Sequence, residues 1–187
     1  QILPDDVAGD KEYRRVCREY ELKSKNSVEL LQAYLDKYPD SRYTDRVRSL
    51  IASVYFEEGK YKEAIAMFRA CDLEALPDAE RDDCAMRLAT SYLKEGNLRD
   101  ASVWFLLLKE VSPRYQSDAT YNLAYIDYVE KRYNKALDAF LSLKDDAVYS
   151  SLVPYYIGEI YLLQGNYEQA RSVAERYLKV YSGHKDE

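Results

Sequence analysis

Few side chains in this sequence could perform acid–base, nucleophilic or metal-dependent chemistry. The single histidine, His184, is one of the last four residues, so the rest of the chain has no imidazole to act as a general base. The three cysteines are odd in number and widely spaced without a C-x-x-C motif, which argues against a zinc site and against a disulfide framework: Cys17, Cys71 and Cys84. Cys71 and Cys84 flank one predicted connection between repeats. They either form a disulfide or remain two free thiols, and the sequence leaves both alternatives open. We therefore expect no histidine-based catalysis, no metal site and no cofactor.

The composition predicts a helical protein that does not bind nucleic acid. The chain has 187 residues, of which 47% are hydrophobic and 20 are tyrosine, but only 6 are glycine and 5 are proline, too few for the turns of a many-stranded β protein. The net charge of −6 disfavours binding to a phosphate backbone. No run of apolar residues is long enough to span a membrane. Because the sequence starts with Gln1, we expect a processed or shortened chain whose targeting signal has been removed.

A repeat of 34–37 residues organises the chain. Four segments place an alanine four residues before a bulky residue or its counterpart, and the alanines Ala64, Ala101, Ala136 and Ala170 are 37, 35 and 34 residues apart. Leu30 takes the alanine position in an earlier, looser copy. The four segments are KYKEAIAMF (60–68), NLRDASVWF (97–105), RYNKALDAF (132–140) and NYEQARSVA (166–174).

A second pattern precedes each of these segments by about a dozen residues: an aliphatic residue, a small residue and, three residues further on, usually a tyrosine. Gly59, Gly96 and Gly165 then break the chain as left-handed helix ends would. Together the two patterns predict repeated pairs of antiparallel helices, in which small residues allow close approach. The expected pairs are 10–22 with 27–38, 43–58 with 61–73, 78–95 with 98–111, 115–130 with 133–143, and 149–164 with 167–181.

These motifs resemble the tetratricopeptide repeat (TPR), which has a 34-residue period. IASVYFEEGKYKEAIAMF and LATSYLKEGNLRDASVWF fit best, whereas the fourth copy has Lys131 in place of glycine and Asp127 in place of tyrosine. The resemblance implies an all-α fold, a right-handed α–α superhelix of about five hairpins forming a single domain over 1–187. The expected repeats are 10–42, 43–77, 78–114, 115–147 and 148–187.

A narrower resemblance concerns residues 34–65, which include the turn Tyr38-Pro39-Asp40-Ser41. Similar repeats occur in bacterial envelope proteins, including the periplasmic coordinator of the Tol-Pal system and lipoproteins of outer-membrane assembly. This resemblance implies a periplasmic or outer-membrane-associated protein, with a cytoplasmic location as the alternative. The end of the sequence, YSGHKDE (181–187), resembles an inter-repeat joint, so we also expect a longer array or association of the exposed end with another molecule.

The repeat assigns ten of the tyrosines to packing: Tyr13, Tyr20, Tyr34, Tyr55, Tyr61, Tyr92, Tyr133, Tyr161, Tyr167 and Tyr177. Cys17 takes the small-residue position of its copy. Asp127 stands where the other copies have tyrosine, and a buried carboxylate needs a partner. We expect a hydrogen bond from a neighbouring tyrosine hydroxyl, or else a contact near a bound ligand.

The TPR resemblance implies that the first helices of the repeats line a concave groove that binds a peptide. The helical register predicts a groove with a basic N-terminal end and an aromatic C-terminal end. Its predicted residues are Arg14, Arg18, Arg46, Met86, Tyr121, Asn122, Tyr125, Tyr128, Tyr155 and Glu159. The alternative is that the tyrosines only fill the seam between adjacent helices.

Three functions compete on this evidence. The first is a non-enzymatic scaffold that binds a peptide or protein segment in the groove. The second is a structural spacer or oligomerisation arm of a larger envelope protein. The third is a glycan-binding or muramidase-type superhelix, for which Asp127 and Glu159 are the only candidate carboxylates.

Overall fold

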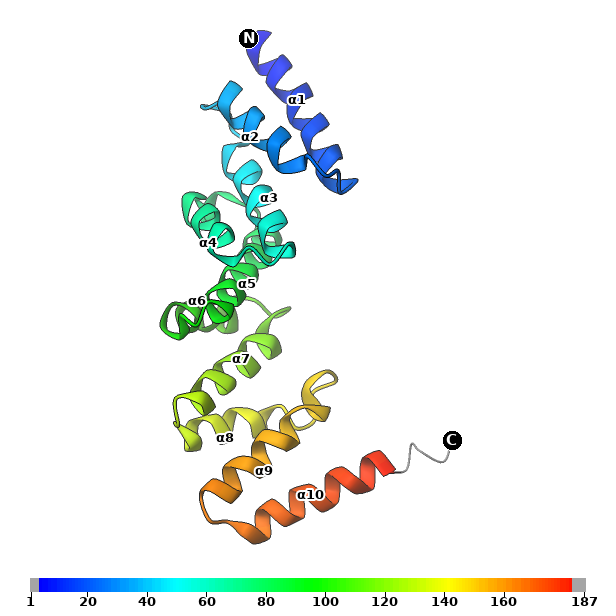
Figure 1. The fold of residues 1–187 in the computed structure, drawn as a ribbon, viewed down its shortest axis with the longest axis vertical. Helices are drawn as coiled ribbons and strands as arrows, with labels where there is room; N and C mark the ends of the chain where they lie inside the picture. Colours follow the sequence, from blue (N-terminus) through cyan, green and yellow to red (C-terminus); the bar gives the residue numbers. More distant parts are fainter. Residues whose placement is uncertain (1–3, 183–187) are drawn as a thin grey trace. The chain divides into compact units, whose positions relative to one another are not determined.

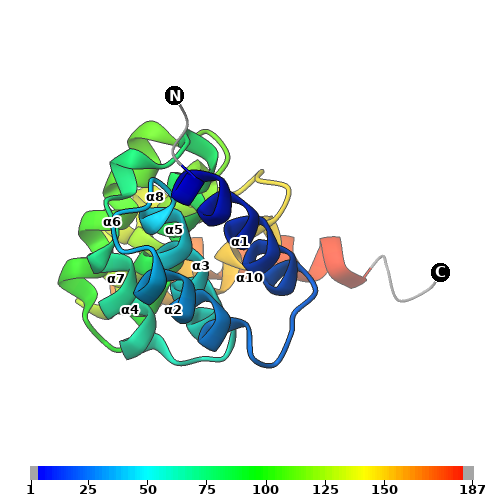
Figure 2. The same cartoon turned by 90° about the horizontal axis from the view of Figure 1, so that it is seen from above.

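The computed structural model describes residues 4–182, and every regular element among them is helical (Figures 1 and 2). The α-helices are α1 (Pro4–Glu21), α2 (Ser27–Lys37), α3 (Thr44–Glu57), α4 (Tyr61–Ala70), α5 (Asp78–Lys94), α6 (Leu98–Val111), α7 (Gln116–Val129), α8 (Tyr133–Ser142), α9 (Val153–Leu163) and α10 (Tyr167–Ser182). Two short 3₁₀ turns, η1 (Leu73–Ala75) and η2 (Tyr149–Ser151), precede α5 and α9. The predicted all-α class is confirmed, and His184 lies outside the described residues. None of the described helices has both the length and the apolar composition needed to cross a membrane.

The helices gather into two compact units, residues 1–104 and 105–187, whose boundary falls inside α6. In the N-terminal unit α1 packs against α2, and α2 packs against α3. α3 also packs against α4 and α5, and α4 packs against α5. In the C-terminal unit α7 packs against α8, α8 against α9, and α9 against α10. From α1 to α5 and from α7 to α10, each helix therefore contacts its neighbour in sequence, as the hairpin repeat predicts.

The alanine-to-aromatic spacing marks the contact between the two helices of a hairpin. Ala64 and Phe68 of α4, like Ala136 and Phe140 of α8, are at most 1% exposed. An alanine at the contact lets the partner helix approach, and the aromatic ring one turn on fills the space beside it. This is why the pattern could be read from the sequence alone.

Two helices start at different residues from those expected. α1 begins at Pro4 and not at residue 10, and its Gly9 is buried, where an added Cβ would lie 3.6 Å from the ring of Tyr38. α9 begins at Val153 after the turn η2, and Pro154 occupies its first turn, where the missing N–H has no helical partner to lose. Both starts depend on packing or on proline position.

The hairpin turns confirm the expected left-handed backbone. Gly59, Gly96 and Gly165 have φ of 74°, 77° and 77°, and Lys131 takes the same position in the fourth copy with φ of 64°. A residue with a Cβ is strained there, by about 1–2 kcal/mol, because its Cβ approaches the following carbonyl oxygen.

Replacing Lys131 with glycine is therefore expected to stabilise the protein. The relieved strain exceeds the extra entropy that glycine gives the unfolded chain, so the free energy of unfolding should rise by about 0.5–1 kcal/mol in urea denaturation. The matched control is Gly96→Lys, which should lower it by about 1 kcal/mol. Equal stabilities of Lys131→Gly and wild type would contradict the strain.

The core of the N-terminal unit is built around Tyr13 and Tyr34, with Val16, Leu31, Val47 and Ile51. Tyr13 stacks on Tyr43 with ring centroids 3.8 Å apart and lies 7% exposed. Its buried hydroxyl makes no well-formed hydrogen bond among the described residues, although the weakly polar Cys17 thiol lies close to it. Burial is also the main reason that the pKa of Tyr13 is raised.

Tyr13→Phe is therefore expected to keep the ring packing and remove an unsatisfied polar group. The free energy of unfolding should rise by about 1 kcal/mol, measured by urea denaturation. Tyr34→Phe serves as the control, because the Tyr34 hydroxyl is hydrogen-bonded to Ser41 Oγ at 2.6 Å and its loss should be destabilising. A loss of stability in Tyr13→Phe would mean that the hydroxyl has a partner.

The ten tyrosines assigned to packing range from buried to exposed, and five of them are half-buried: Tyr20, Tyr55, Tyr61, Tyr133 and Tyr161. Tyr13, Tyr34 and Tyr92 are at most 7% exposed, whereas Tyr167 and Tyr177 of α10 are 69% and 39% exposed. The expectation that the last two would be packed is wrong. No described helix lies against the outer side of α10 to cover them.

Candidate functional site

Tyr156 of α9 is the centre of an aromatic group that the sequence did not reveal. Its ring stacks on Phe140 at 4.8 Å and 6°, and it meets Tyr125 at 6.2 Å and Tyr128 at 5.3 Å edge-on. Tyr121 also contacts it, at 6.3 Å. We call Tyr121, Tyr125, Tyr128, Tyr149, Tyr155 and Tyr156 the tyrosine cluster; it lies within the C-terminal unit.

Three of the predicted groove tyrosines contact one another through Tyr156. Tyr121 also stacks on Tyr149 of η2 with centroids 4.4 Å apart. Tyr155 differs, because it is 65% exposed and touches the cluster only through the edge-on contact with Tyr156 at 5.3 Å. The cluster therefore holds most rings in place and presents Tyr155 to solvent.

Glu159 places a carboxylate against the tyrosine cluster. The Tyr128 hydroxyl donates a hydrogen bond to Glu159 Oε2 at 2.9 Å. Burial and this bond to a carboxylate raise the pKa of Tyr128 to about 12. The Tyr149 hydroxyl similarly donates to the Asp118 carboxylate, and the pKa of Tyr149 is raised as well, first by burial and then by that bond.

These shifts predict a loss of stability in alkali. The folded state holds the Tyr128 proton more tightly than the unfolded state, whose tyrosine pKa is about 10. The stabilisation is complete below pH 10 and should decrease as the pH rises from 10 towards 12. Urea denaturation between pH 9 and 11.5 tests this, and Tyr128→Phe should show a shallower decrease than wild type; equal slopes would contradict the assignment.

The basic part of the predicted site lies in the N-terminal unit. Arg14 and Arg18 are exposed on α1, and Arg14 Nε donates to the Asp10 carbonyl at 3.4 Å. Arg46 is paired with Glu80 at 3.2 Å and stands over the Tyr13 ring at 5.9 Å. Of these three predicted arginines, Arg14 and Arg18 thus have no carboxylate partner within residues 4–182.

Two further predicted residues have polar or partly buried surroundings. The Asn122 side-chain amide donates to the Asp118 carbonyl at 2.8 Å along α7, and Met86 is half-buried on α5. Neither makes a described contact with the tyrosine cluster. They remain predicted members of the groove.

Asp127 has a partner, although not the expected tyrosine. Its carboxylate accepts a hydrogen bond from Arg132 Nε at 2.7 Å, and its carbonyl accepts one from the Arg132 backbone N–H at 2.8 Å. The left-handed turn at Lys131 brings these two residues together. Asp127 therefore closes the hairpin turn, and Glu159, the other candidate carboxylate, is bound to Tyr128.

The cysteines are free thiols in the structure. The Cys71 thiol is within hydrogen-bond reach of the Met67 carbonyl at 3.3 Å, and burial raises its pKa to about 12. Burial also raises the pKa of Cys84, to about 11. Thiols with such pKa values are weak nucleophiles at neutral pH. Among the described residues, no group of three or more histidine, cysteine or acidic side chains is arranged to hold a metal ion.

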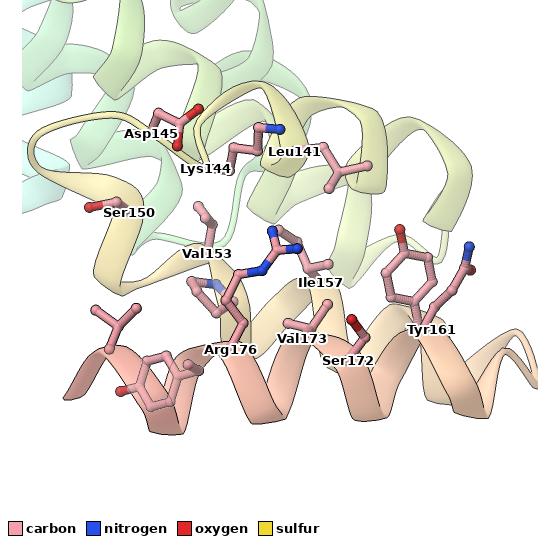
Figure 3. Close-up of a pocket in the computed structure, with 14 residues that line it drawn as sticks. Leu141, Lys144, Asp145, Ser150, Val153, Ile157, Tyr161, Ser172, Val173 and Arg176 are labelled. Carbon is pink, nitrogen blue, oxygen red and sulfur yellow. The ribbon is translucent and has the colours of Figure 1, made fainter. Parts of the chain in front are cut away.

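Two hollows flank α10. One, of about 490 Å³, lies between α10 and the connection from α8 to α9, and Figure 3 shows Arg176 reaching from α10 into it towards Ile157. The other, of about 610 Å³, lies between α9 and α10 and is mostly apolar. We call the second the terminal groove; it is lined by Pro154, Tyr155, Gly158, Glu159, Leu162, Tyr167, Ala170, Arg171, Val173, Ala174, Tyr177 and Leu178.

The helical hairpins packed one on the next define a helical repeat fold. Residues 46–73 and 155–184 each match a tetratricopeptide repeat family, and neither match is to an enzyme family. The chain therefore contains tetratricopeptide repeats in these two segments. No curated protein matches the sequence.

Solved structures of TPR proteins have the same fold. YrrB, described as a TPR protein with an unusual peptide-binding site, is 18% identical with a TM-score of 0.73 over 91% of this chain and 84% of its own. MamA is 15% identical with a TM-score of 0.68, over 96% and 97% of the two chains. TPR-like repeats of a putative kinesin light chain from Podosopora anserina are 13% identical with a TM-score of 0.64, over 99% and 100%. At these identities the likeness establishes the TPR superhelix fold, and nothing among them supports the narrower envelope resemblance.

Proposed function

We propose that this protein is a non-enzymatic scaffold that binds a peptide or protein segment along the face formed by the first helices of its repeats. The observation that carries the proposal is the tyrosine cluster, whose rings are fixed by mutual packing around Tyr156 while Tyr155 stays 65% exposed. Rigid tyrosines suit recognition because they offer a large contact area and a hydroxyl at little cost in side-chain entropy.

Two further observations support this proposal. The fold is one that generally mediates protein–protein interaction, and YrrB, which shares it, is described as having a peptide-binding site. In the N-terminal unit Arg14 and Arg18 are exposed on one side of α1, four residues apart. Within that unit they would attract acidic side chains of a bound segment.

Selection of binders from a random dodecapeptide display library on the immobilised chain tests the proposal. The affinity of the selected peptide is then measured by calorimetry for wild type, Tyr125→Ala and Tyr155→Ala. We expect each variant to weaken binding at least tenfold, because both rings lie on the proposed face. The control is Val103→Ala on α6, which changes a side chain 63% exposed outside the cluster. Equal affinities of wild type and both tyrosine variants would overturn the proposal.

We also propose an envelope location, which rests on the Tyr38-Pro39-Asp40-Ser41 turn and its resemblance to envelope repeats. In the structure Ser41 Oγ is hydrogen-bonded to the Tyr34 hydroxyl and accepts the Tyr43 backbone N–H at 3.0 Å, so the turn is a defined joint. Fractionation of the source cells followed by immunoblotting tests this location, and recovery of the protein in the cytoplasmic fraction alone would contradict it.

A further inference from the structure

The hollow between α10 and the connection from α8 to α9, which we call the side hollow, combines an apolar back with a charged rim. The core residues Val153 and Ile157 of α9 form its back, together with half-buried Leu141 and Val173. Its volume of about 490 Å³ is within the range of about 300–1,000 Å³ that small-molecule sites occupy. The side hollow is therefore large enough to hold a small organic molecule.

The side hollow exists because the second helices of the fourth and fifth repeats differ in length. α8 ends at Ser142, and Leu143 turns onto the core, where it is 5% exposed. The residues 34 positions later are Arg176 and Tyr177, and there α10 continues as a regular helix to Ser182. Tyr177 lines the side hollow and is 39% exposed, so it does not close the space as Leu143 does. The hollow is thus a feature of the fifth repeat and not of repeat packing in general.

Two cations face the side hollow from opposite sides. Figure 3 shows Lys144 on the connection after α8 and Arg176 reaching up from α10 on the facing side. Neither side chain makes an ion pair with a carboxylate of residues 4–182. Two positive charges that converge without an anion repel each other, and an anion held between them removes this repulsion. The pair therefore favours an anionic group at this point.

We propose that the side hollow binds a small organic acid that has one carboxylate and one compact apolar group. The Arg176 guanidinium donates to the carboxylate, since its planar fork matches the two carboxylate oxygens. The Lys144 ammonium adds a second contact from the opposite side. The apolar group lies against Leu141, Ile157 and Val173, where it is removed from water.

Asp145 limits the charge of the ligand. It follows Lys144 directly, also lines the side hollow, and has no ion-pair partner within residues 4–182 (Figure 3). A second negative group on the ligand would be repelled by this carboxylate. We therefore expect monocarboxylates to bind, and dianions such as dicarboxylates and phosphate monoesters to be disfavoured.

Isothermal titration calorimetry of the full chain with hydrocinnamate, a phenyl ring on a short chain that ends in a carboxylate, tests the proposal. We expect saturable binding with a dissociation constant of about 0.1–1 mM, an affinity in keeping with the size of the ligand. Arg176→Gln should weaken binding at least tenfold and Lys144→Gln at least threefold. Arg171→Gln, on the same helix but outside the side hollow, is the matched control and should bind as wild type.

Changes in the ligand test each of its groups separately. Hydrocinnamamide keeps the ring but lacks the charge, and acetate keeps the charge but lacks the ring; both should bind at least tenfold more weakly than hydrocinnamate. Phenylsuccinate carries a second carboxylate and should bind wild type at least threefold more weakly than hydrocinnamate. Asp145→Asn should reduce this last difference.

The side chains of Lys144, Asp145 and Arg176 are exposed, so their variants should fold as wild type does, which circular dichroism checks. The proposal is overturned if hydrocinnamate does not bind saturably, if the acid and the amide bind equally, or if Arg176→Gln binds as wild type. Weakening by Arg171→Gln would show that the acid binds in the terminal groove, which would also overturn it.

This proposal fails separately from peptide binding along the tyrosine cluster. Tyr125 does not line the side hollow, so Tyr125→Ala should weaken the dodecapeptide and leave the affinity for hydrocinnamate unchanged. Arg176→Gln should do the reverse.

Discussion

Replacing Tyr156 with alanine is expected to lower the free energy of unfolding by about 3 kcal/mol. The change removes a ring that stacks on Phe140 and contacts four tyrosines edge-on, and it leaves a cavity between α7, α8 and α9. The neighbouring helices can collapse only partly into this space, so lost dispersion contacts add to the lost hydrophobic burial. Urea denaturation followed by circular dichroism measures the effect.

The adjacent tyrosine provides a matched control for this change. Tyr155→Ala removes the same number of atoms from a side chain that is 65% exposed, and should cost less than about 0.5 kcal/mol. Tyr156→Phe should lie close to wild type if ring packing dominates. Similar losses for Tyr155→Ala and Tyr156→Ala would show that Tyr156 is not the centre of the cluster.

The second large effect is expected at the aromatic position of the repeat, which Phe140 occupies in the fourth copy and Ala174 in the fifth. Phe140→Ala is expected to cost about 3–5 kcal/mol, because Phe140 is completely buried beneath α9 and stacks on Tyr156. Ala174, 34 residues later, holds the same position on an uncovered helix. Ala174→Phe should therefore change the free energy of unfolding by less than about 0.5 kcal/mol.

Both variants are measured by urea denaturation under the same conditions. A large destabilisation by Ala174→Phe would mean that the terminal groove has no room for an aromatic side chain. A small effect of Phe140→Ala would contradict the role of the aromatic position in the hairpin core.

The hairpins could be predicted because their determinants are local in sequence. A small residue, an aromatic residue one turn later and a glycine at the turn specify two helices and the left-handed residue between them, and Gly59, Gly96 and Gly165 all have that conformation. Even Lys131 follows the pattern, since the surrounding helices impose the turn on a residue that disfavours it.

The candidate site could be predicted only in part. Its tyrosines on α7 follow from the helical period, but Tyr155 and Tyr156 are neighbours in sequence and differ by about 100° around the helix axis. The repeat pattern shows which side of a helix faces its partner in the same hairpin. It does not show whether the ring of Tyr155 or that of Tyr156 contacts the preceding repeat. The partner of Asp127 could not be predicted from the sequence for a similar reason. The helical face of Asp127 suggested a tyrosine partner, but the hairpin turn brings Arg132 to it instead.

The sequence by itself determined the repeat, the helices and the turns, because contacts within a hairpin link residues at fixed short spacings. Only the tertiary structure decided that Tyr156 organises the tyrosine cluster, that Tyr155 and Tyr167 are exposed, and that an open groove lies between α9 and α10. These features depend on how one repeat packs on the next. A residue that is buried in one copy is exposed in another where no described helix packs on it, although its local sequence is almost the same.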